Sequence, residues 1–197
     1  MFESFTEKYL SEFLSTNFIN IVPKRSPDGC AIAILLLGKW NMKHLTFEKF
    51  MQLVIMHIMQ LLRDQTSQIN GLRILFDFKG TGLPLLNMCS PQNLYICNHM
   101  ILNCLPIRIK GLHTIHGSFV LRLVWPIAKR ILSHKIRDRV HFHSTFEDLF
   151  EYFPPSVLPT MYDGELLESD MEQGISWIRK ANNEHRENTI EGQPNIY

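Results

Sequence analysis

The feature of this sequence that most constrains its fold is an unbroken apolar run, Cys30–Leu37, which reads CAIAILLL. A strand with one face in water alternates apolar and polar side chains, and this run has no polar position. It therefore predicts a strand covered on both faces, as in parallel sheets flanked by helices. Asn17–Val22 predicts a preceding strand, and the turn Ser26–Gly29 predicts that the two strands form a hairpin.

Helical and extended patterns alternate along the rest of the chain. Apolar spacing predicts helices over Thr46–Asp64, Pro91–Leu102, Ser118–Leu132, His134–Val140, Phe146–Tyr152 and Glu168–Lys180. Apolar or alternating runs predict strands over Leu72–Phe78, Ile107–Ile115 and Val140–His143. This order predicts one α/β domain with right-handed crossovers and a mixed, mainly parallel sheet on which helices pack. Pro126 is expected to kink or interrupt its helix.

The two ends of the chain predict short appendages to this domain. Aromatic side chains at three- and four-residue steps predict a short helix within Met1–Asn17, and the polar residues from Asn182 onward are expected to be loose. The first residues lack the apolar core of a signal peptide, so none is expected. Without a run of about 18 apolar residues, we expect a cytoplasmic protein whose membrane contact is peripheral and transient.

The sequence carries no motif that predicts catalysis, a cofactor or a metal. It has no HExxH or CxxC pair, no GxGxxG or P-loop, and no GxSxG nucleophile turn. His141 and His143 would share one face of a strand, but no third ligand lies at a supporting spacing, so ordinary histidines are favoured. Four thiols are expected to be reduced and buried: Cys30, Cys89, Cys97 and Cys104. We expect no enzymatic activity, and the net charge of +1 argues against nucleic acid as the main partner.

Basic side chains are concentrated in one segment. Eight Lys and Arg residues lie between Leu105 and His143 against one acid, Asp138, and eleven acids follow from Ser144 to Tyr197. The basic segment includes a helix with an apolar side, and apolar surface beside cations is typical of segments that lie in a lipid interface. A solvated basic face without a partner is the alternative that the spacing leaves open.

Several motifs, in this order along the chain, resemble the CRAL-TRIO family, in its α-tocopherol transfer protein-like and retinaldehyde-binding-like branch. They are Gly38–Asn41 (GKWN), Gly71–Gly80 (GLRILFDFKG), Leu105–His113 (LPIRIKGLH), Leu132–Val140 (LSHKIRDRV), Phe153–Pro159 (FPPSVLP) and Tyr162–Glu165 (YDGE). The resemblance covers Asn17–Lys180. It implies a lipid-binding domain over 17–180, a short helical remnant of the family's N-terminal domain over 1–16, and a polar tail over 181–197.

The resemblance implies a cavity between the sheet and a movable lid helix, placed at Phe119–Leu132. The cavity would hold an apolar ligand such as a tocopherol, a retinoid or a phospholipid. Val54 and Ile58 match positions that carry hydroxyl groups in the tocopherol carrier, which implies a more apolar pocket here. The candidate cavity residues are Leu37, Met51, Val54, Ile58, Phe76, Phe78, Ile101, Leu105, Ile107, Leu112, Ile115, Phe119, Val120 and Leu123.

A basic patch at the gate is the second site that the resemblance implies. In the tocopherol-carrier branch the matching positions bind phosphatidylinositol bisphosphates, and all are basic here: Arg108, Lys110, Lys129, Lys135 and Arg139. Recognition of a multivalent phosphate requires such convergent cations. The predicted function is transfer of a hydrophobic ligand between membranes. A phosphoinositide-binding regulatory or scaffold module and a truncated, non-transferring isoform are the alternatives.

Overall fold

The computed structural model describes residues 18–191, and its centre is one six-stranded sheet. Within that range the strands are β1 (Ile19–Ile21), β2 (Ala31–Leu36), β3 (Leu72–Asp77), β4 (Ile109–Ile115), β5 (Val140–Phe142) and β6 (Glu172–Gln173). Their spatial order is β5-β4-β3-β2-β1-β6. Strands β2 to β5 run parallel, and β1 pairs antiparallel with both β2 and β6. The mixed, mainly parallel sheet and the hairpin of β1 and β2 are thus confirmed.

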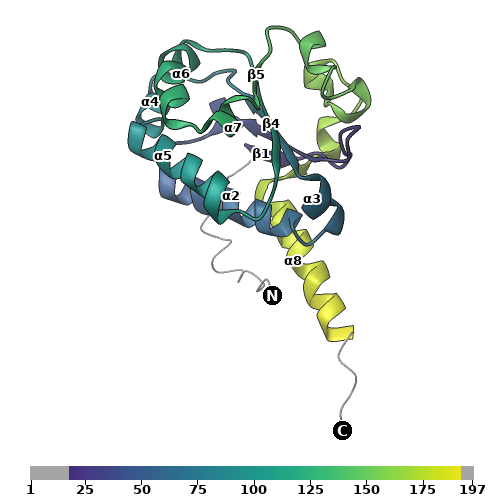
Figure 1. Ribbon diagram of the computed structural model, residues 1–197. Coiled ribbons are helices and arrows are strands. Elements are labelled where there is room, and N and C mark those ends of the chain that lie inside the picture. Colours follow the sequence, from purple (N-terminus) through teal and green to yellow (C-terminus); the bar gives the residue numbers. More distant parts are fainter. Residues whose placement is uncertain (1–17, 192–197) are drawn as a thin grey trace.

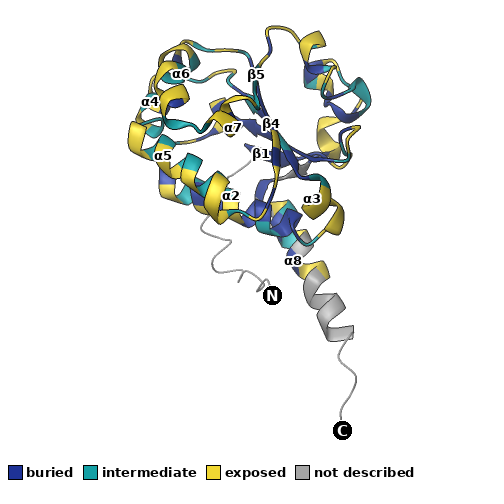
Figure 2. Cartoon of the chain, in the orientation of Figure 1, coloured by how far each residue is buried: buried dark blue, intermediate teal, exposed yellow. Residues whose placement is uncertain are grey.

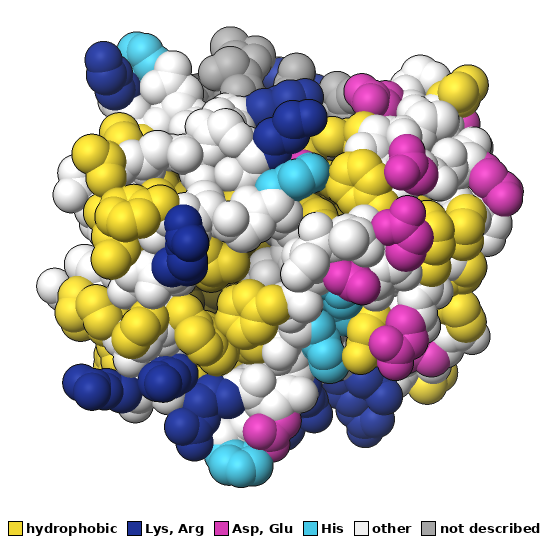
Figure 3. Space-filling view, turned by 90° about the horizontal axis from the view of Figure 1, so that it is seen from above, with side chains coloured by type: hydrophobic (Ala, Val, Ile, Leu, Met, Phe, Trp, Pro, Cys, Tyr) yellow, Lys and Arg dark blue, Asp and Glu magenta, His cyan; other side chains and the backbone are white. Residues whose placement is uncertain are grey.

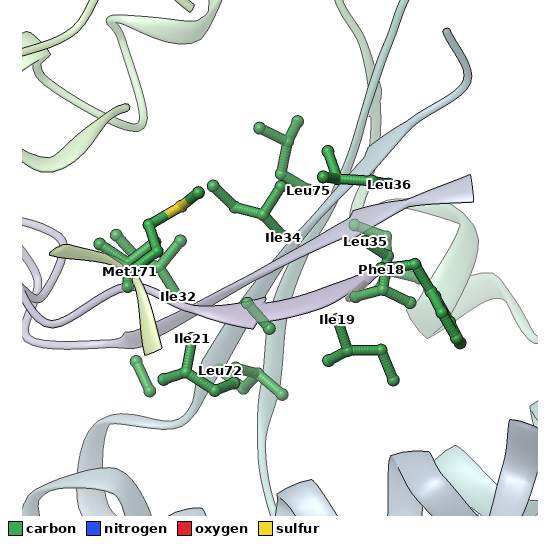
Figure 4. Packing of buried hydrophobic residues seen from close by; sticks show 14 of the residues in the cluster. Phe18, Ile19, Ile21, Ile32, Ile34, Leu35, Leu36, Leu72, Leu75 and Met171 are labelled. Atoms are coloured by element: carbon green, nitrogen blue, oxygen red, sulfur yellow. The ribbon is translucent and has the colours of Figure 1, made fainter. Parts of the chain in front are cut away.

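The apolar run forms β2, and all six of its residues are buried. Alternate side chains point to opposite faces of the sheet, so both faces of β2 pack in the core. Figure 4 shows Ile34 and Leu75 on one side of the strands, and Ile19 and Leu72 on the other. Since neither face of β2 meets water, its sequence needs no polar position.

Helices that connect the parallel strands lie on one face of the sheet. In the described part of the chain they are α2 (Phe47–Leu61), α3 (Gln65–Asn70), α4 (Pro84–Met88), α5 (Pro91–His99), α6 (Phe119–Ile131) and α7 (His134–Arg137). Strands β2 to β5 follow one another across the sheet in a single direction, so right-handed crossovers place their helices on the same face. Figure 1 shows α2, α4, α5 and α6 together on one side of the strands. The predicted cap is confirmed, because the Thr46 side chain accepts a hydrogen bond from the Lys49 backbone N–H.

The opposite face is covered by the chain from Ser144 to Met171. Its regular structure consists of short 3₁₀ turns at Glu147–Leu149, Pro155–Val157, Thr160–Tyr162 and Glu168–Asp170. Phe153 and Tyr162 from this segment are fully buried. Figure 2 shows the buried residues concentrated on the strands and on the inward sides of the elements that cover them. The last helix, α8 (Gly174–Glu191), packs against α2 and β1.

Several expected helices have other bounds or another form in the structure, among them His134–Val140, which is helical only to Arg137. The helix predicted over Pro91–Leu102 is α5 to His99, and the chain continues as a π-helical turn, Met100–Cys104. Phe146–Tyr152 forms only the 3₁₀ turn already described. The helix predicted over Glu168–Lys180 is replaced by a 3₁₀ turn, β6 and α8, which continues beyond Asn182, because pairing with β1 holds the first part extended. The helix expected within Met1–Asn17 lies outside the described residues.

Pro126 does not interrupt its helix, contrary to the expectation. Helix α6 is continuous from Phe119 to Ile131, with Pro126 inside it. A proline in a helix interior costs about 3 kcal/mol through its missing N–H and its ring. Burial of Val120 and Ala128, on either side of the proline, holds both halves of α6 against the rest of the molecule.

Candidate functional site

An apolar cavity of about 150 Å³ lies between the helix-covered face of the sheet and α2, α5 and the π-helical turn. Its wall consists of strand side chains that point toward the helices, the inner face of α2, and the chain from Cys97 to Leu105. The lining residues are Ile19, Ile21, Ala33, Leu35, Phe50, Met51, Val54, His57, Ile58, Leu61, Leu72, Ile74, Phe76, Cys97, Met100, Ile101, Leu105, Ile109 and Leu112. The surface of this cavity is apolar almost throughout.

Half of the predicted cavity residues line this cavity. They are Met51, Val54, Ile58, Phe76, Ile101, Leu105 and Leu112. The structure places seven others elsewhere: Leu37, Phe78, Ile107, Ile115, Phe119, Val120 and Leu123. Ile115 is buried, but it lies three positions beyond Leu112 in β4 and so points to the other face of the sheet. Leu37 is buried in the turn that follows β2, beyond the part of that strand that the cavity touches.

The helix expected to form the lid does not line the cavity. Helix α6 packs against α4 and α5, and the cavity wall on that side is formed by α5 and the π-helical turn. Val120 is buried against these neighbours, while Phe119 is 56% and Leu123 is 44% exposed. The cover of the cavity is therefore α5 with Met100–Cys104, and α6 forms an outer layer.

Sequence reasoning missed most of the strand side of the cavity. Ile19 and Leu35 are register partners and both point into it. Since β2 is apolar at every position, its sequence does not tell which alternate residues face the helices. Ile74 could have been predicted, because it lies two positions before Phe76 on β3 and therefore faces the cavity as Phe76 does.

His57 of α2 lines the cavity and carries a buried, ionisable side chain. Its Nδ1 lies 2.8 Å from the backbone oxygen of Leu53, to which a neutral ring can donate. Burial lowers the pKa of His57 to about 4. The ring stacks on Trp177 of α8, with 5.7 Å between centroids. His57 thus contributes a neutral, largely apolar surface and joins α2 to α8.

A second, basic pocket of about 440 Å³ lies beside the apolar cavity. It is lined by Ile101, Leu102, Leu105, Ile107, Arg108, Ile109, Lys110, Lys135, Ile136 and Arg139. Four of the five predicted phosphate-binding cations are therefore brought together around one pocket. The fifth, Lys129, lies outside it, at the end of α6, where its backbone oxygen accepts a hydrogen bond from Arg137.

The cations come from two elements that meet at the start of β4. Arg108 and Lys110 are exposed while Ile107 and Ile109 are buried, as the alternation predicted. The Arg139 guanidinium donates a hydrogen bond to the Ile109 backbone oxygen, which ties the end of the α7 segment to β4. Among the side chains that the structure describes, the ion pairs formed include none of these cations. Their charges remain available to an anionic ligand.

Gly71 fixes the position of Arg108. Its φ is +91°, and a Cβ at this position would lie 2.3 Å from the Arg108 backbone oxygen. The backbones approach closely because the Leu72 N–H donates to the same oxygen, at 2.8 Å. Glycine is therefore required for both the conformation and the contact.

The two pockets share part of their walls. Ile101, Leu105 and Ile109 line both. The pairing between β3 and β4 is irregular at this point. Leu72 pairs with Ile109 but Arg73 pairs with Gly111, so Lys110 is an extra residue in β4. A bulge of this kind re-aims side chains locally. It allows Ile109 and Leu112 to face the apolar cavity although they are three positions apart.

An apolar stripe on α6 lies on the outer surface. Phe119, Leu123 and Ile127 follow one another at four-residue steps and are 56%, 44% and 44% exposed. Figure 3 shows hydrophobic side chains gathered on the side that carries α4 and α6, with Lys and Arg along one border and acidic side chains on the opposite side of the molecule. This arrangement places exposed apolar side chains beside cations on one outer surface of the molecule.

The other face of the sheet carries a polar network with a structural role. Asp77 accepts hydrogen bonds from the Tyr162 hydroxyl and from His116 Nδ1, each at 2.8 Å. His113 and His143 lie on the same face, with 3.0 Å between Nδ1 and Nε2. Burial lowers the pKa of both rings, to about 3 for His113. These contacts anchor the segment Ser144–Met171 to the sheet.

The described side chains form no group of three or more His, Cys, Asp or Glu arranged to hold a metal ion. The thiols of Cys89 and Cys97 are protonated, because burial raises their pKa values to about 11 and 12. Only Cys30 of the four thiols is fully buried, contrary to the expectation that all four are, since Cys89 and Cys97 are partly buried and Cys104 is exposed. Between residues 18 and 191, no helix combines the length and the apolar character needed to cross a bilayer.

Comparison with protein families gives a match to the CRAL/TRIO domain over residues 15–164. Among curated proteins, the human alpha-tocopherol transfer protein-like protein is 25% identical over 171 residues, which is 86% of this chain and 50% of that protein. Clavesin-1 of Rattus norvegicus is 22% identical over 182 residues, or 91% of this chain and 51% of clavesin-1. The chain thus spans about half the length of these relatives.

A solved structure supports the same fold. The crystal structure of Sfh5 matches with a TM-score of 0.62 at 14% sequence identity. The match covers 96% of this chain and 68% of the Sfh5 chain. At this level of identity the likeness concerns the arrangement of the elements alone.

Proposed function

Because the chain belongs to the CRAL/TRIO domain family, we propose that it binds a lipophilic molecule in the apolar cavity and transfers it between membranes without catalysing a reaction. The observation that carries this proposal is the pairing of a nearly wholly apolar cavity with an adjoining basic pocket. The first offers burial to a hydrocarbon, at about 25 cal/mol for each Å² removed from water. The second offers four cations to anionic headgroups.

Membrane contact is the second part of the proposal. The stripe Phe119, Leu123 and Ile127 can enter the lipid boundary while the cations nearby attract anionic lipids. A multivalent phosphate such as that of phosphatidylinositol bisphosphate suits a pocket with Arg108, Lys110, Lys135 and Arg139. The association is peripheral and transient, because its strength comes from a small apolar area and from charges that salt screens.

The cavity is small for a lipid carrier. Its volume of about 150 Å³ is close to that of an engineered cavity that binds benzene, while pockets for larger ligands have roughly 300–1,000 Å³. A tocopherol, a retinoid or a phospholipid would require the cover formed by α5 and the π-helical turn to move outward. Ligand entry is therefore coupled to displacement of Met100–Cys104.

The small cavity also favours a second candidate function, a phosphoinositide-binding regulatory or scaffold module that carries no lipid. Such a module would use the basic pocket and the α6 stripe in the same way. It would bind anionic vesicles with its apolar cavity closed. The two functions differ in one observable property, which is whether a lipophilic molecule is taken up.

Native mass spectrometry of the purified protein, with extraction and identification of bound lipids, tests the proposal. Replacing Ile58 by Trp should fill the cavity and reduce uptake of fluorescent tocopherol, retinoid and phospholipid analogues by tenfold or more, since Ile58 is buried in the wall. Ile55→Trp is the matched control, because Ile55 lies on the same helix but is 37% exposed. Equal uptake by both variants would reject the cavity as the binding site, and no uptake by the unaltered protein would favour the regulatory module.

A further inference from the structure

Strand β5 is an open edge of the sheet. It is the last strand in the spatial order, and it pairs in parallel with β4 (Figure 1). The Arg139 oxygen accepts a hydrogen bond from β4 at 2.7 Å, and the His143 N–H donates one to β4 at 2.9 Å. Successive residues of a strand direct their backbone groups to alternate sides, so those of Val140 and Phe142 point away from β4. Between residues 18 and 191, no strand pairs with that side.

Side chains on both faces of the sheet hold this edge in its extended form. The His141 ring stacks on His113 of β4, with 4.8 Å between centroids. On the other face, the Phe142 ring meets Trp125 of α6 edge-on at 4.9 Å, yet Phe142 remains 49% exposed. An extended edge with unpaired backbone groups is a template on which another strand can form hydrogen bonds.

The charge changes sign along this edge. Arg137 and Arg139 lie directly before β5, and Arg137 is exposed. Beyond its other end, the Asp148 carboxylate accepts hydrogen bonds from the backbone N–H groups of Ser144 and Thr145, at 2.8 and 3.0 Å. Among the side chains that the structure describes, the ion pairs include neither Arg137 nor Asp148. The edge is therefore basic where β5 begins and acidic where it ends.

We infer that the free edge of β5 pairs antiparallel with the same edge of a second copy of this chain, about a two-fold axis at His141. Val140 of each copy then lies opposite Phe142 of the other. Each of these pairs exchanges two backbone hydrogen bonds, which use the groups that point away from β4. Both copies contribute the same surface, as a two-fold interface requires.

Charge complementarity identifies the partner and the direction of pairing. In this register Arg137 of one copy lies opposite Thr145 of the other, whose N–H is bonded to the Asp148 carboxylate. Because the axis is two-fold, this contact between opposite charges occurs twice. Parallel pairing would instead place basic against basic and acidic against acidic residues, which is unfavourable.

The axis is perpendicular to the sheet, so the helices of both copies cover the same face of the joined sheet. Helix α6 lies beside the seam, since Trp125 contacts Phe142. The exposed stripes of both α6 helices are therefore presented on one side of the dimer. Two linked surfaces bind one membrane more tightly than either does alone.

Sedimentation velocity of the full chain, from about 5 to about 500 µM, tests this inference. A reductant is included because Cys104 is exposed. We expect a monomer–dimer equilibrium that Phe142→Pro weakens by about tenfold or more, because proline removes an N–H from the free side of β5 and none from the side that pairs with β4. Phe142→Thr is the matched control, since it removes the same ring but keeps the N–H, and it should weaken the dimer less.

A charge exchange provides a second test that does not alter the strand. Arg137→Glu places like charges across the seam, and so does Glu147→Lys at the exposed residue before Asp148. Each variant alone should associate about tenfold more weakly. An equimolar mixture of the two should recover the dimer, because both contacts then join opposite charges.

Three results would each overturn the inference. They are a chain that stays monomeric at the highest concentration, equal losses in Phe142→Pro and Phe142→Thr, and a mixture of charge variants that associates no better than either alone. A monomer that binds an extended peptide at this edge would show that the partner is not a second copy. Arg137, Phe142 and Glu147 line neither pocket, so uptake of a lipophilic molecule should be the same in all these variants, and the proposed function is tested separately.

Discussion

Two buried histidines make the stability of this protein depend on pH. Burial lowers the pKa of His57 to about 4, and burial with the neighbouring His141 and His143 lowers that of His113 to about 3. Both rings are therefore neutral in the native state at pH 7. In the unfolded chain a histidine takes up a proton near pH 6.5. As the pH falls below about 6.5 the unfolded state binds more protons than the native state, so acid favours unfolding.

We expect each of these two residues to remove about 2 kcal/mol from the free energy of unfolding between pH 7 and pH 5. The loss starts below the unfolded pKa and is complete only below the native pKa values of about 4 and 3. Urea unfolding at several pH values measures it. In the His57→Leu protein the pH dependence should be weaker by that amount, and in His44→Gln, where the residue is exposed, it should be unchanged. An identical pH dependence in His57→Leu and the unaltered protein would count against this account.

At the scale of residues, the helix side of the cavity was predictable from the sequence and the strand side was not. Val54 and Ile58 follow from helical periodicity, which assigns each position of α2 to a side. On a strand the assignment depends on register, and a shift of one residue reverses every side chain. Ile115 was placed in the cavity because the extra residue in β4 is not visible in the sequence pattern. Ile107 lies near its predicted place, but in the basic pocket.

Among the elements, α6 combines a buried side with an exposed apolar stripe. Val120 and Ala128 are buried, whereas Phe119 and Leu123 are roughly half exposed. Apolar side chains that contribute little to the core can be replaced without a large change in stability. The same side chains would be buried if α6 docks on a membrane.

Replacing Phe119 and Leu123 by Ser should therefore weaken binding to anionic vesicles by tenfold or more, because each loses an apolar contact of about 1 kcal/mol or more with the lipid. The melting temperature should change little. Liposome flotation measures binding, and Ile69→Ser, at a residue of α3 that is 69% exposed, is the control. Should the double variant float as well as the unaltered protein, α6 is not the docking element.

Periodicity in the sequence located the long elements and failed for the short ones. The apolar run of β2 and the helix from Phe47 to Leu61 are confirmed. Strand β6 has two residues and is defined only by its pairing with Asn20 and Ile21, which no local pattern encodes. The π-helical turn continues α5 with the same residue types, so no local pattern marks its change in winding.

Across the whole molecule, charge is distributed unevenly. Eight basic residues and one acid lie between Leu105 and His143, and the acids that follow gather on the segment that covers the other face of the sheet. A molecule with this distribution is oriented by an anionic surface before contact. Because salt screens such attraction within about 10 Å at 0.1 M, the orientation depends on ionic strength.

Binding to vesicles that contain phosphatidylinositol bisphosphate should fall steadily as salt is raised from 50 to 500 mM. Replacing Lys135 and Arg139 by Ala should weaken it by about tenfold or more at low salt, since each cation near the surface contributes about 1 kcal/mol. Lys39 and Lys79 lie beyond the carboxyl ends of β2 and β3, away from the start of β4, and their replacement by Ala is the charge-matched control. Equal losses in both double variants would show that net charge alone governs binding.

The ladder between β3 and β4 contains one residue more on the β4 side, since Ile109 pairs with Leu72 and Gly111 with Arg73. If Lys110 alone were deleted, β4 would pair with β3 without a bulge, and Leu112 would stay on the same face of the sheet. At a regular ladder position, the loss of one residue would instead turn all later side chains over. The sheet of this chain can therefore lose Lys110 from the wall of the basic pocket while the geometry of its core is kept.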